Sequence, residues 1–204
     1  MNVGIADLGI GNFAAMEKMV AQVGGSPRRL TSPDDLGDLD RLILPGVGAF
    51  DYAAAQVDER GWREPLRDLF REGRVPVLAV CVGMELLLDA SDEGPGSGLG
   101  WIPGRCRRFD AADSPGIKVP HMGWNEVSVT RSSPLLAAGA QDRFYFVHSY
   151  YTDVAAEHVV ATATYGRAFP AVINRGSVTG VQFHPEKSHR FGLQLVSAFL
   201  AAPC

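Results

Sequence analysis

This chain of 204 residues has few cysteines, a small net charge and no long apolar run. Cys81, Cys106 and Cys204 are too widely spaced for a disulfide framework or a metal-binding pattern. The formal net charge is −4, and the one basic cluster, at residues 105–108, is too short for a nucleic-acid surface. No apolar stretch approaches the ~20 residues that span a bilayer, and the first residues lack the features of a signal peptide. These absences predict a cytoplasmic protein without a metal site, a nucleic-acid partner or a membrane anchor.

The remaining composition is that of an ordinary globular protein. Hydrophobic residues make up 46% of the chain and charged residues 21%. A chain of this length can bury a sizeable core. Because no internal repeat, low-complexity segment or flexible linker interrupts the sequence, we expect a single domain over residues 1–204.

Strand and helix signals alternate in the first half of the chain. Apolar runs at residues 3–6, 42–44 and 77–80 predict strands that are buried on both faces. Apolar residues recur at helical spacing between residues 13 and 23, and a longer helix is expected over residues 52–71, with Gly61 and Pro65 as points of interruption. This alternation predicts a parallel sheet that is covered by helices on both faces.

The pattern changes after residue 91. A loop is expected at residues 92–98, and a closing helix at residues 190–201. Between them lie β-like runs at residues 105–109, 126–130, 144–150, 159–164, 171–174 and 178–183. The fold class is therefore α/β, with a central, mostly parallel sheet, helices on both faces and added antiparallel strands.

Cys81 stands at the junction of a predicted strand and a predicted helix. The apolar strand at residues 77–80 ends at this cysteine, Gly83 allows a turn, and apolar residues at helical spacing follow. The positive end of a helix favours thiolate over thiol, so this position suits a nucleophile. The alternative is a buried structural cysteine.

His184 and Glu186 have the spacing of a base and its orienting acid. They directly follow an apolar strand, and the carboxyl ends of parallel strands are where open sheets gather their sites. A carboxylate two residues away can bind one ring nitrogen while the other faces Cys81. The alternative is a surface histidine beside an acid. His121 and His148 have no such acid and are interpreted as structural, substrate-lining or partner-facing.

Acyl chemistry also requires donors for an oxyanion. Val47 and Gly48 follow a predicted parallel strand, as Cys81 does, and glycines let a backbone N–H turn toward a ligand. The N–H groups of Val47 or Gly48, together with that of Val82, are candidates for an oxyanion hole. An ordinary glycine-rich turn is the alternative.

Together these residues resemble the triad, or class I, glutamine amidotransferases, and in particular the glutaminase subunits of imidazole glycerol phosphate synthase. The resemblance covers nearly the whole chain. Its motifs are residues 7–12, 44–50, 81–84, 98–101, 120–125, 145–150 and 182–188.

The resemblance implies a flavodoxin-like fold, no cofactor and a triad of Cys81, His184 and Glu186. Glutamine would be hydrolysed to glutamate and ammonia through a thioester on Cys81. Ammonia would then pass to a partner, a (β/α)8-barrel cyclase with which the chain forms a heterodimer. In that family the cyclase forms imidazole glycerol phosphate and an aminoimidazole carboxamide ribotide in histidine biosynthesis.

The resemblance also implies roles outside the triad. Ser149 and Tyr150 would contact the amino-acid end of glutamine, and Val47 would belong to the strand whose peptide completes the oxyanion hole. The residues implied at the partner interface are Asn12, His121, Trp124, Tyr145 and Lys187.

The chain departs from the family pattern at three positions. Glu85 stands where the family usually has a substrate-contacting glutamine, Ala79 where glycine is frequent, and Leu8 where tyrosine is common. Because Glu85 follows Cys81 by one helical turn, its carboxylate disfavours a thiolate unless it is protonated or paired. Glu85 is expected to be a substrate-binding residue that alters glutamine affinity.

Three other interpretations remain open. Residues 9–14 follow a strand and match the pattern G-x-G-x-x-A, so an NAD-binding domain is one alternative. Glu85 favours a second, a paralogous amidotransferase subunit that serves another synthase. The third is a catalytically weak protein that only binds and regulates a barrel enzyme.

Overall fold

Five parallel strands form one half of the main sheet. The computed structural model describes residues 1–110, 112, 116–137 and 139–203. In order across the sheet, the parallel strands are β2 (Ser26–Leu30), β1 (Asn2–Ala6), β3 (Arg41–Gly46), β4 (Val77–Cys81) and β13 (Val178–Val181). All residues of β3, β4 and β13 are buried, as expected for strands covered on both faces.

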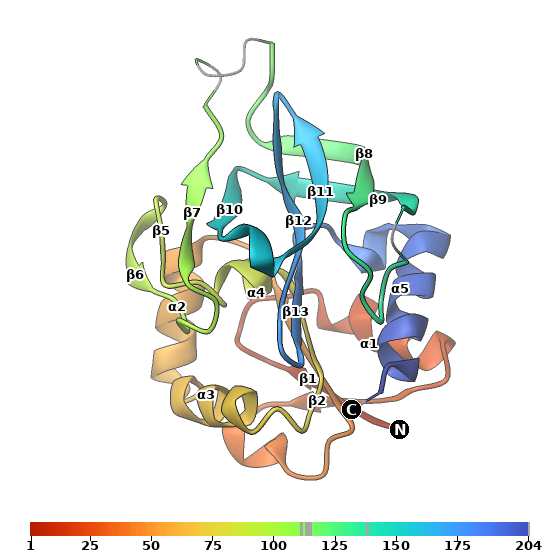
Figure 1. Ribbon diagram of the computed structural model, residues 1–204. Helices are drawn as coiled ribbons and strands as arrows, with labels where there is room; N and C mark the ends of the chain where they lie inside the picture. Colours follow the sequence, from red (N-terminus) through yellow and green to blue (C-terminus); the bar gives the residue numbers. More distant parts are fainter. Residues whose placement is uncertain (111, 113–115, 138, 204) are drawn as a thin grey trace.

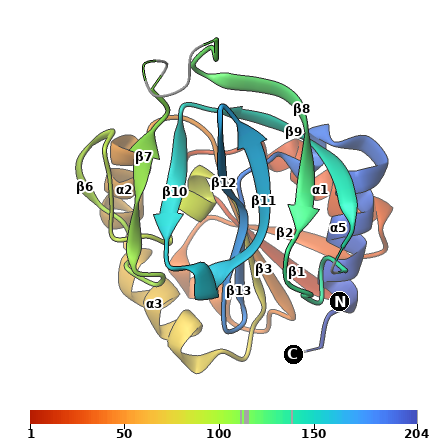
Figure 2. The same cartoon turned by 45° about the horizontal axis from the view of Figure 1, so that its top comes forward.

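The same sheet continues with antiparallel strands. Beyond β13 these are β12 (Arg167–Arg175), β11 (Val159–Tyr165), β8 (His121–Val129) and β9 (Gln141–His148). A second, four-stranded sheet lies beside α2 and α3 (Figure 2) and contains β10 (Tyr150–Val154), β7 (Gly104–Arg108), β5 (Ala90–Ser91) and β6 (Gly94–Ser97).

Helices cover the parallel half on both sides. Figure 1 shows α1 (Phe13–Gln22) and α5 (His189–Ala201) on one side, and α2 (Phe50–Glu59) and α3 (Arg63–Glu72) on the other. The short helical turns are α4 (Val82–Glu85), η1 (Pro33–Leu36), η2 (Ala156–His158) and η3 (Pro185–Lys187). No helix among the described residues is long and apolar enough to cross a membrane. The α/β fold class expected from the sequence is therefore confirmed, with the antiparallel strands joined to the parallel ones in one sheet.

The segment expected to form one helix over residues 52–71 forms two. Gly61 adopts φ +71°, a left-handed conformation that ends α2 and that side chains rarely adopt. Pro65 lies in the first turn of α3, where a missing N–H costs no helical hydrogen bond. Trp62 between the helices is fully buried, so the break is fixed by core packing.

Two further expectations are corrected. The expected loop at residues 92–98 contains β6, because this segment pairs antiparallel with β5. The carboxylate of Asp51 accepts a hydrogen bond from the N–H of Gly96 at 2.9 Å and holds the segment against α2. The apolar residues after Cys81 form only the single turn α4, and the chain then leaves through turns.

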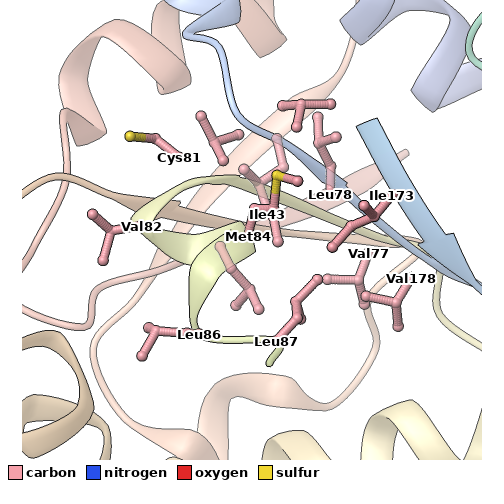
Figure 3. Close-up of a cluster of buried hydrophobic side chains, with 14 of the residues drawn as sticks. Ile43, Val77, Leu78, Cys81, Val82, Met84, Leu86, Leu87, Ile173 and Val178 are labelled. Carbon is pink, nitrogen blue, oxygen red and sulfur yellow. The ribbon is translucent and has the colours of Figure 1, made fainter. Parts of the chain in front are cut away.

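Buried apolar side chains surround β4 and α4. In Figure 3 the apolar side chains of Ile43, Leu78, Met84 and Ile173 pack together. Cys81 lies at the margin of this cluster, with its sulfur directed away from those side chains. The core therefore fixes the backbone on either side of Cys81, while the thiol points away from these side chains.

Two glycines let the end of β3 approach the turn after Cys81. A Cβ atom on Gly83 would overlap the carbonyl oxygen of Leu44, and one on Gly46 would overlap the backbone N of Gly83. Both clashes are with backbone, which cannot swing aside as a flexible side chain can. The contact is therefore open only to glycine at both positions.

Replacing Gly83 with alanine tests this contact. We expect G83A to lower the free energy of unfolding by about 2–4 kcal/mol, because β3 and α4 must separate to admit the methyl group. Urea unfolding measures the loss. The matched control is G37A, since nothing lies within 4 Å of the position of a Gly37 Cβ and its φ of −65° suits alanine. Equal stability of the two variants would contradict the proposed close packing.

Candidate active site

The Cys81 backbone adopts a strained conformation. Its φ of 54° and ψ of −113° lie outside the regions that residues with side chains normally populate. Such strain persists only where the surrounding structure enforces it, and it is typical of a nucleophile on a sharp strand-to-helix turn. Here β3 enforces it, because Gly46 pairs with Cys81 at the last position of the two strands.

The expectation that Cys81 rests as a thiolate is wrong for the isolated chain. The side chain is 4% exposed, and burial raises the pKa of its thiol well above the usual range. Where Glu85 is ionised, its charge raises this pKa further, whereas a hydrogen bond from the Val82 N–H lowers it. One turn of helix is too short to outweigh burial. The thiol therefore keeps its proton until a base removes it.

His184 and Glu186 form a buried pair. His184 Nδ1 lies 2.8 Å from Glu186 Oε1, and the two side chains are 1% and 4% exposed. The carboxylate accepts from Nδ1–H, so Nε2 carries the lone pair. Among the described residues Nε2 has no hydrogen-bond partner although it is buried. Its free lone pair makes it a candidate proton acceptor.

The backbone around His184 is held on both sides. Its N–H donates to the carbonyl of Tyr145 at 2.9 Å. Its carbonyl accepts from the hydroxyl of Ser188 at 2.6 Å, and that hydroxyl oxygen accepts from the Tyr145 N–H at 3.0 Å. The ring is therefore positioned by β9 as well as by its own segment.

Cys81 and His184 line the same pocket, of about 350 Å³. The pocket opens at the carboxyl ends of β3, β4 and β13, where the sequence places the candidate groups. Its walls are formed by Val47, Gly48, Cys81, Val82, Glu85, Glu93, Pro120, Val147, His148, Ser149, Tyr150, His184 and Lys187. Glu186 and His184 both line a small neighbouring cavity, to which Asn12 also contributes.

The candidate oxyanion-hole residues meet at this pocket. Val47, Gly48 and Val82 all line it, and Gly48 adopts φ +111°. The N–H of Val82 is already directed at the Cys81 sulfur. Val47 is 40% exposed, so its segment is packed loosely compared with the strand that precedes it.

The substrate-binding candidates Glu85, Ser149 and Tyr150 also line the pocket. Glu85 is 4% exposed, and burial raises the pKa of its carboxyl to about 8. The Gln182 side chain donates to Glu85 Oε1 from Nε2 at 2.9 Å, which lowers the pKa by a smaller amount. Glu85 is therefore protonated at neutral pH, and its charge is removed from beside Cys81.

Glu93 is a pocket residue that sequence reasoning missed. Its Oε2 accepts from the Phe50 N–H at 2.6 Å, at the start of α2, which fixes the carboxylate at the pocket wall. Glu93 lies in a segment of small and acidic residues with no periodic signal. A lone acid in such a segment cannot be distinguished from a solvated surface acid by its pattern.

The candidates for the partner interface fall into two groups. Trp124 is 40% exposed; its ring stacks on His189 at 5.6 Å between centroids and meets the Tyr145 ring edge-on at 6.3 Å. Lys187 Nζ lies 5.7 Å from the centroid of Tyr145. Asn12 is exposed and caps α1. His121, in contrast, is 3% exposed and lies inside the protein.

The described residues offer no group of three or more histidine, cysteine or acidic side chains arranged to hold a metal ion. The chemistry available at the pocket is that of a thiol, an imidazole with its carboxylate, and backbone N–H groups. Such a set is suited to acyl transfer from an amide.

Comparison with known proteins identifies the class first. Residues 28–201 match the family model "Glutamine amidotransferase class-I". A solved structure described as "Crystal structure of glutamine amidotransferase" superimposes with a TM-score of 0.71 at 21% identity, covering 95% of this chain and 98% of the other. The PurLQS structure from Thermotoga maritima gives 0.76 at 17% identity, with 98% and 97% covered. At these identities the structures show the shared fold alone.

Sequence relatives narrow the class. The chain is 47% identical over 190 residues to the imidazole glycerol phosphate synthase subunit HisH of Streptococcus gordonii, covering 93% of this chain and 90% of that protein. It is 43% identical over 198 residues to the HisH subunit of Bdellovibrio bacteriovorus, covering 96% and 97%. The chain therefore belongs to the class I glutamine amidotransferases, and within them to the HisH family. The family inferred from the sequence motifs is confirmed.

The state of Glu85 predicts how stability depends on pH. Its pKa rises from 4.5 to about 8 on folding, so between these values the unfolded chain releases a proton that the folded protein keeps. The contribution of Glu85 to stability therefore falls as pH rises from about 4.5 to about 8 and is constant above. E85Q removes this loss and keeps an acceptor for Gln182. Its advantage over the parent should grow across that window, to at most ~5 kcal/mol.

Urea unfolding of both proteins at pH 5, 7 and 9 measures this advantage. The exposed residue Glu126 supplies the matched control E126Q, whose difference from the parent should stay flat with pH. A pH-independent difference for E85Q would mean that Glu85 is ionised in the folded protein.

Proposed function

We propose that this chain is the glutaminase subunit of imidazole glycerol phosphate synthase, and that it hydrolyses glutamine to glutamate and ammonia. The observation that carries the proposal is one pocket lined by the strained Cys81 and by His184, whose free Nε2 is backed by Glu186. The HisH relatives over nearly the full chain support the particular synthase. No cofactor is needed for this chemistry.

The proposed reaction has two halves. His184 Nε2 accepts the Cys81 proton as the sulfur attacks the side-chain amide carbon of glutamine, and Glu186 stabilises the resulting imidazolium. The imidazolium then protonates the departing nitrogen, so that ammonia leaves and a thioester remains on Cys81. Water, deprotonated by His184, attacks the thioester, and glutamate leaves as the thiol regains its proton. The raised pKa of the Cys81 thiol makes the base essential at neutral pH.

The oxyanion formed at each step needs donors. The Val82 N–H is one candidate, and the N–H of Val47 or Gly48 is the other. The exposed Val47 and the left-handed Gly48 are consistent with a segment whose peptide can turn toward the pocket.

The far end of the pocket suits the amino-acid end of glutamine. We assign the substrate ammonium to the wall that carries Glu93, because this acid is held in place by the start of α2. Ser149 and Tyr150 would contact the same end from the opposite wall. Glu85, being neutral, would offer a hydrogen bond without repelling the substrate carboxylate.

The partner is proposed to be a (β/α)8-barrel cyclase. Asn12, Trp124, Tyr145 and Lys187 would contact it, with His121 lying beneath this surface. Ammonia would pass to the cyclase without entering bulk water, and the products would be imidazole glycerol phosphate and an aminoimidazole carboxamide ribotide. We further propose that residues 1–204 act as a single glutamine amidotransferase domain in a heterodimer. A reaction that depends on a reduced thiol fits the cytoplasm.

A paralogous subunit serving another synthase is the second candidate, favoured by Glu85. Complementation of a histidine auxotroph that lacks its own glutaminase subunit separates the two. Growth supports the proposed synthase. Failure to grow despite glutaminase activity of the purified chain would favour the paralogue. The NAD-binding alternative has less support, because the relatives that match nearly the whole chain are HisH subunits.

Replacing Cys81 tests the nucleophile. With the cyclase present, we expect C81A to lower glutamine-dependent product formation by at least about 10³-fold, because no thioester can form. Turnover with added ammonium salt should remain, since the cyclase then needs no glutaminase. The matched control is the other described cysteine, Cys106, which is buried outside the pocket, and C106A should keep glutamine-dependent turnover. Glutamine-dependent turnover by C81A would contradict the proposed mechanism.

Glutamine affinity provides a second test at Glu85. We expect E85Q to lower the glutamine KM by about three- to tenfold. A glutamine side chain can form the same hydrogen bond and does not ionise, whereas the Glu85 carboxyl must stay protonated to remain neutral. The gain should be larger at pH 9 than at pH 7, where the parent carboxyl is still protonated. Steady-state glutamate release in the presence of the cyclase measures it. An unchanged or higher KM would contradict this role.

A further inference from the structure

Two buried histidines that the proposed mechanism does not use form a hydrogen-bonded chain. His121 on β8 and His148 at the end of β9 are directly opposite each other across the two strands. His121 Nδ1 lies 2.9 Å from His148 Nε2. His148 Nδ1 lies 2.6 Å from the carbonyl oxygen of Tyr150, and Asn125 Nδ2 lies 3.3 Å from His121 Nε2. The chain thus runs from β8 to the wall of the glutamine pocket.

The donor and the acceptor of every hydrogen bond in this row of side chains follow from its last acceptor, the carbonyl oxygen of Tyr150. A carbonyl oxygen only accepts, so His148 Nδ1 must carry a hydrogen, and Nε2 of a neutral His148 is then an acceptor. His121 must donate to it from Nδ1, which leaves His121 Nε2 as an acceptor for the Asn125 amide. Asn125 fits this order, because the same Nδ2 also donates to the carbonyl of Thr164 at 2.8 Å.

Both rings stay neutral at physiological pH. His121 is 3% and His148 6% exposed, and burial lowers their pKa values to about 4 and about 3. Aromatic side chains surround the two histidine rings and account for their burial. The His121 ring is stacked between Phe146 and Tyr165 at 5.0 and 4.1 Å, and Phe109 meets both imidazoles edge-on. A neutral ring has one donor and one acceptor, so one set of tautomers satisfies the whole chain.

The hydrogen-bonded chain of histidines ends on the backbone of Ser149 and Tyr150, which forms one wall of the glutamine pocket. Ser149 and Tyr150 line the glutamine pocket, between the end of β9 and the start of β10. The Phe109 N–H donates to the carbonyl of Ser149 at 3.0 Å, and His148 donates to that of Tyr150. These two bonds fix both carbonyls of the wall. Loss of the donor from His148 would leave the Tyr150 carbonyl facing a nitrogen lone pair.

We propose that His121 and His148 are positioning residues, which hold the Ser149–Tyr150 wall in the conformation that binds glutamine. His121 acts through His148, because its Nδ1–H selects the tautomer in which His148 donates to Tyr150. This inference rests on the proposed glutaminase function, since it assumes that the pocket holds glutamine. It gives His121 a task within the subunit, where the family resemblance implied one at the interface.

Two substitutions of His121 separate this role from simple packing. H121F keeps a ring between Phe146 and Tyr165 but removes the donor. H121N loses the ring but keeps an N–H where Nδ1 stood. With the cyclase present, we expect H121F to raise the glutamine KM by about tenfold and to change kcat by less than threefold. H121N should lie within about threefold of the parent KM. A purely structural role predicts the reverse order of KM values, because asparagine at position 121 disturbs the aromatic packing more than phenylalanine does.

The matched control is His158, which is half-buried in η2 and does not line the pocket. H158F should leave KM and kcat unchanged. Thermal unfolding of each variant checks that differences in KM do not arise from partial unfolding.

A measurement on the unsubstituted protein keeps the inference testable if H121F does not fold. Nitrogen-15 NMR of labelled histidines distinguishes the two neutral tautomers. We expect the Nδ1–H form for both His121 and His148 from pH 6 to pH 9. An Nε2–H form of either residue would overturn the proposed chain, as would equal KM values for H121F and the parent.

The outcomes also distinguish this inference from the proposed function. If the parent hydrolyses glutamine but its tautomers or KM pattern differ from those expected, only the positioning role fails. If the parent releases no glutamate with the cyclase present while both tautomers are as expected, the hydrogen-bonded chain stands and the glutaminase function fails.

Discussion

The parallel pairing of β4 between β3 and β13 is the constraint on which the site depends. Parallel strands bring their carboxyl ends to one edge, so the residues that follow each strand meet there whatever their separation in sequence. The register makes this specific, since Gly46 pairs with Cys81 and Val80 with Val181. The nucleophile and the candidate oxyanion donors therefore lie beside each other. His184 follows β13 by three residues and reaches the same pocket.

Burial gives this site its particular electrostatics. Burial favours the neutral forms of Cys81 and Glu85, whereas hydrogen bonds from the backbone or from a histidine favour a carboxylate. Glu186 is paired with His184, and Glu93 with the start of α2. Glu85 has only the amide of Gln182, whose own Oε1 lacks a partner among the described residues. A protonated carboxyl can donate as well as accept, so it is compatible with both atoms of this amide. Glu85, which departs from the family pattern, therefore keeps its proton at neutral pH.

Sequence reasoning succeeded where the physics is local or follows strand order. The sharp strand-to-helix turn at Cys81 could be predicted because an apolar strand and a glycine adjoin the cysteine. The spacing of His184 and Glu186 is likewise a local feature of the sequence. The resting thiol was misjudged, because the desolvation of Cys81 depends on side chains that only the fold gathers. The pairing of His121 with His148 could not be read, since it needs the register of two antiparallel strands joined by a long connection. Glu93 gave no periodic signal, and its place is set by a contact with Phe50 from another part of the chain.

The two halves of the main sheet contribute different things to the site. The parallel half supplies reactive groups from strand ends, where a backbone turn can expose a thiol or an N–H. The antiparallel half supplies part of another wall, because its edge strand β9 continues through Ser149 into β10 of the second sheet, and Ser149 and Tyr150 line the pocket. A wall made of continuing strands can be adjusted only through the groups that bind its carbonyls. For this reason the hydrogen bonds to Ser149 and Tyr150 come from Phe109 and His148, side by side in one aromatic cluster. Chemistry and substrate fit are thereby joined through one core, because β9 leads into the wall at Ser149 and its Tyr145 carbonyl also accepts from the His184 N–H.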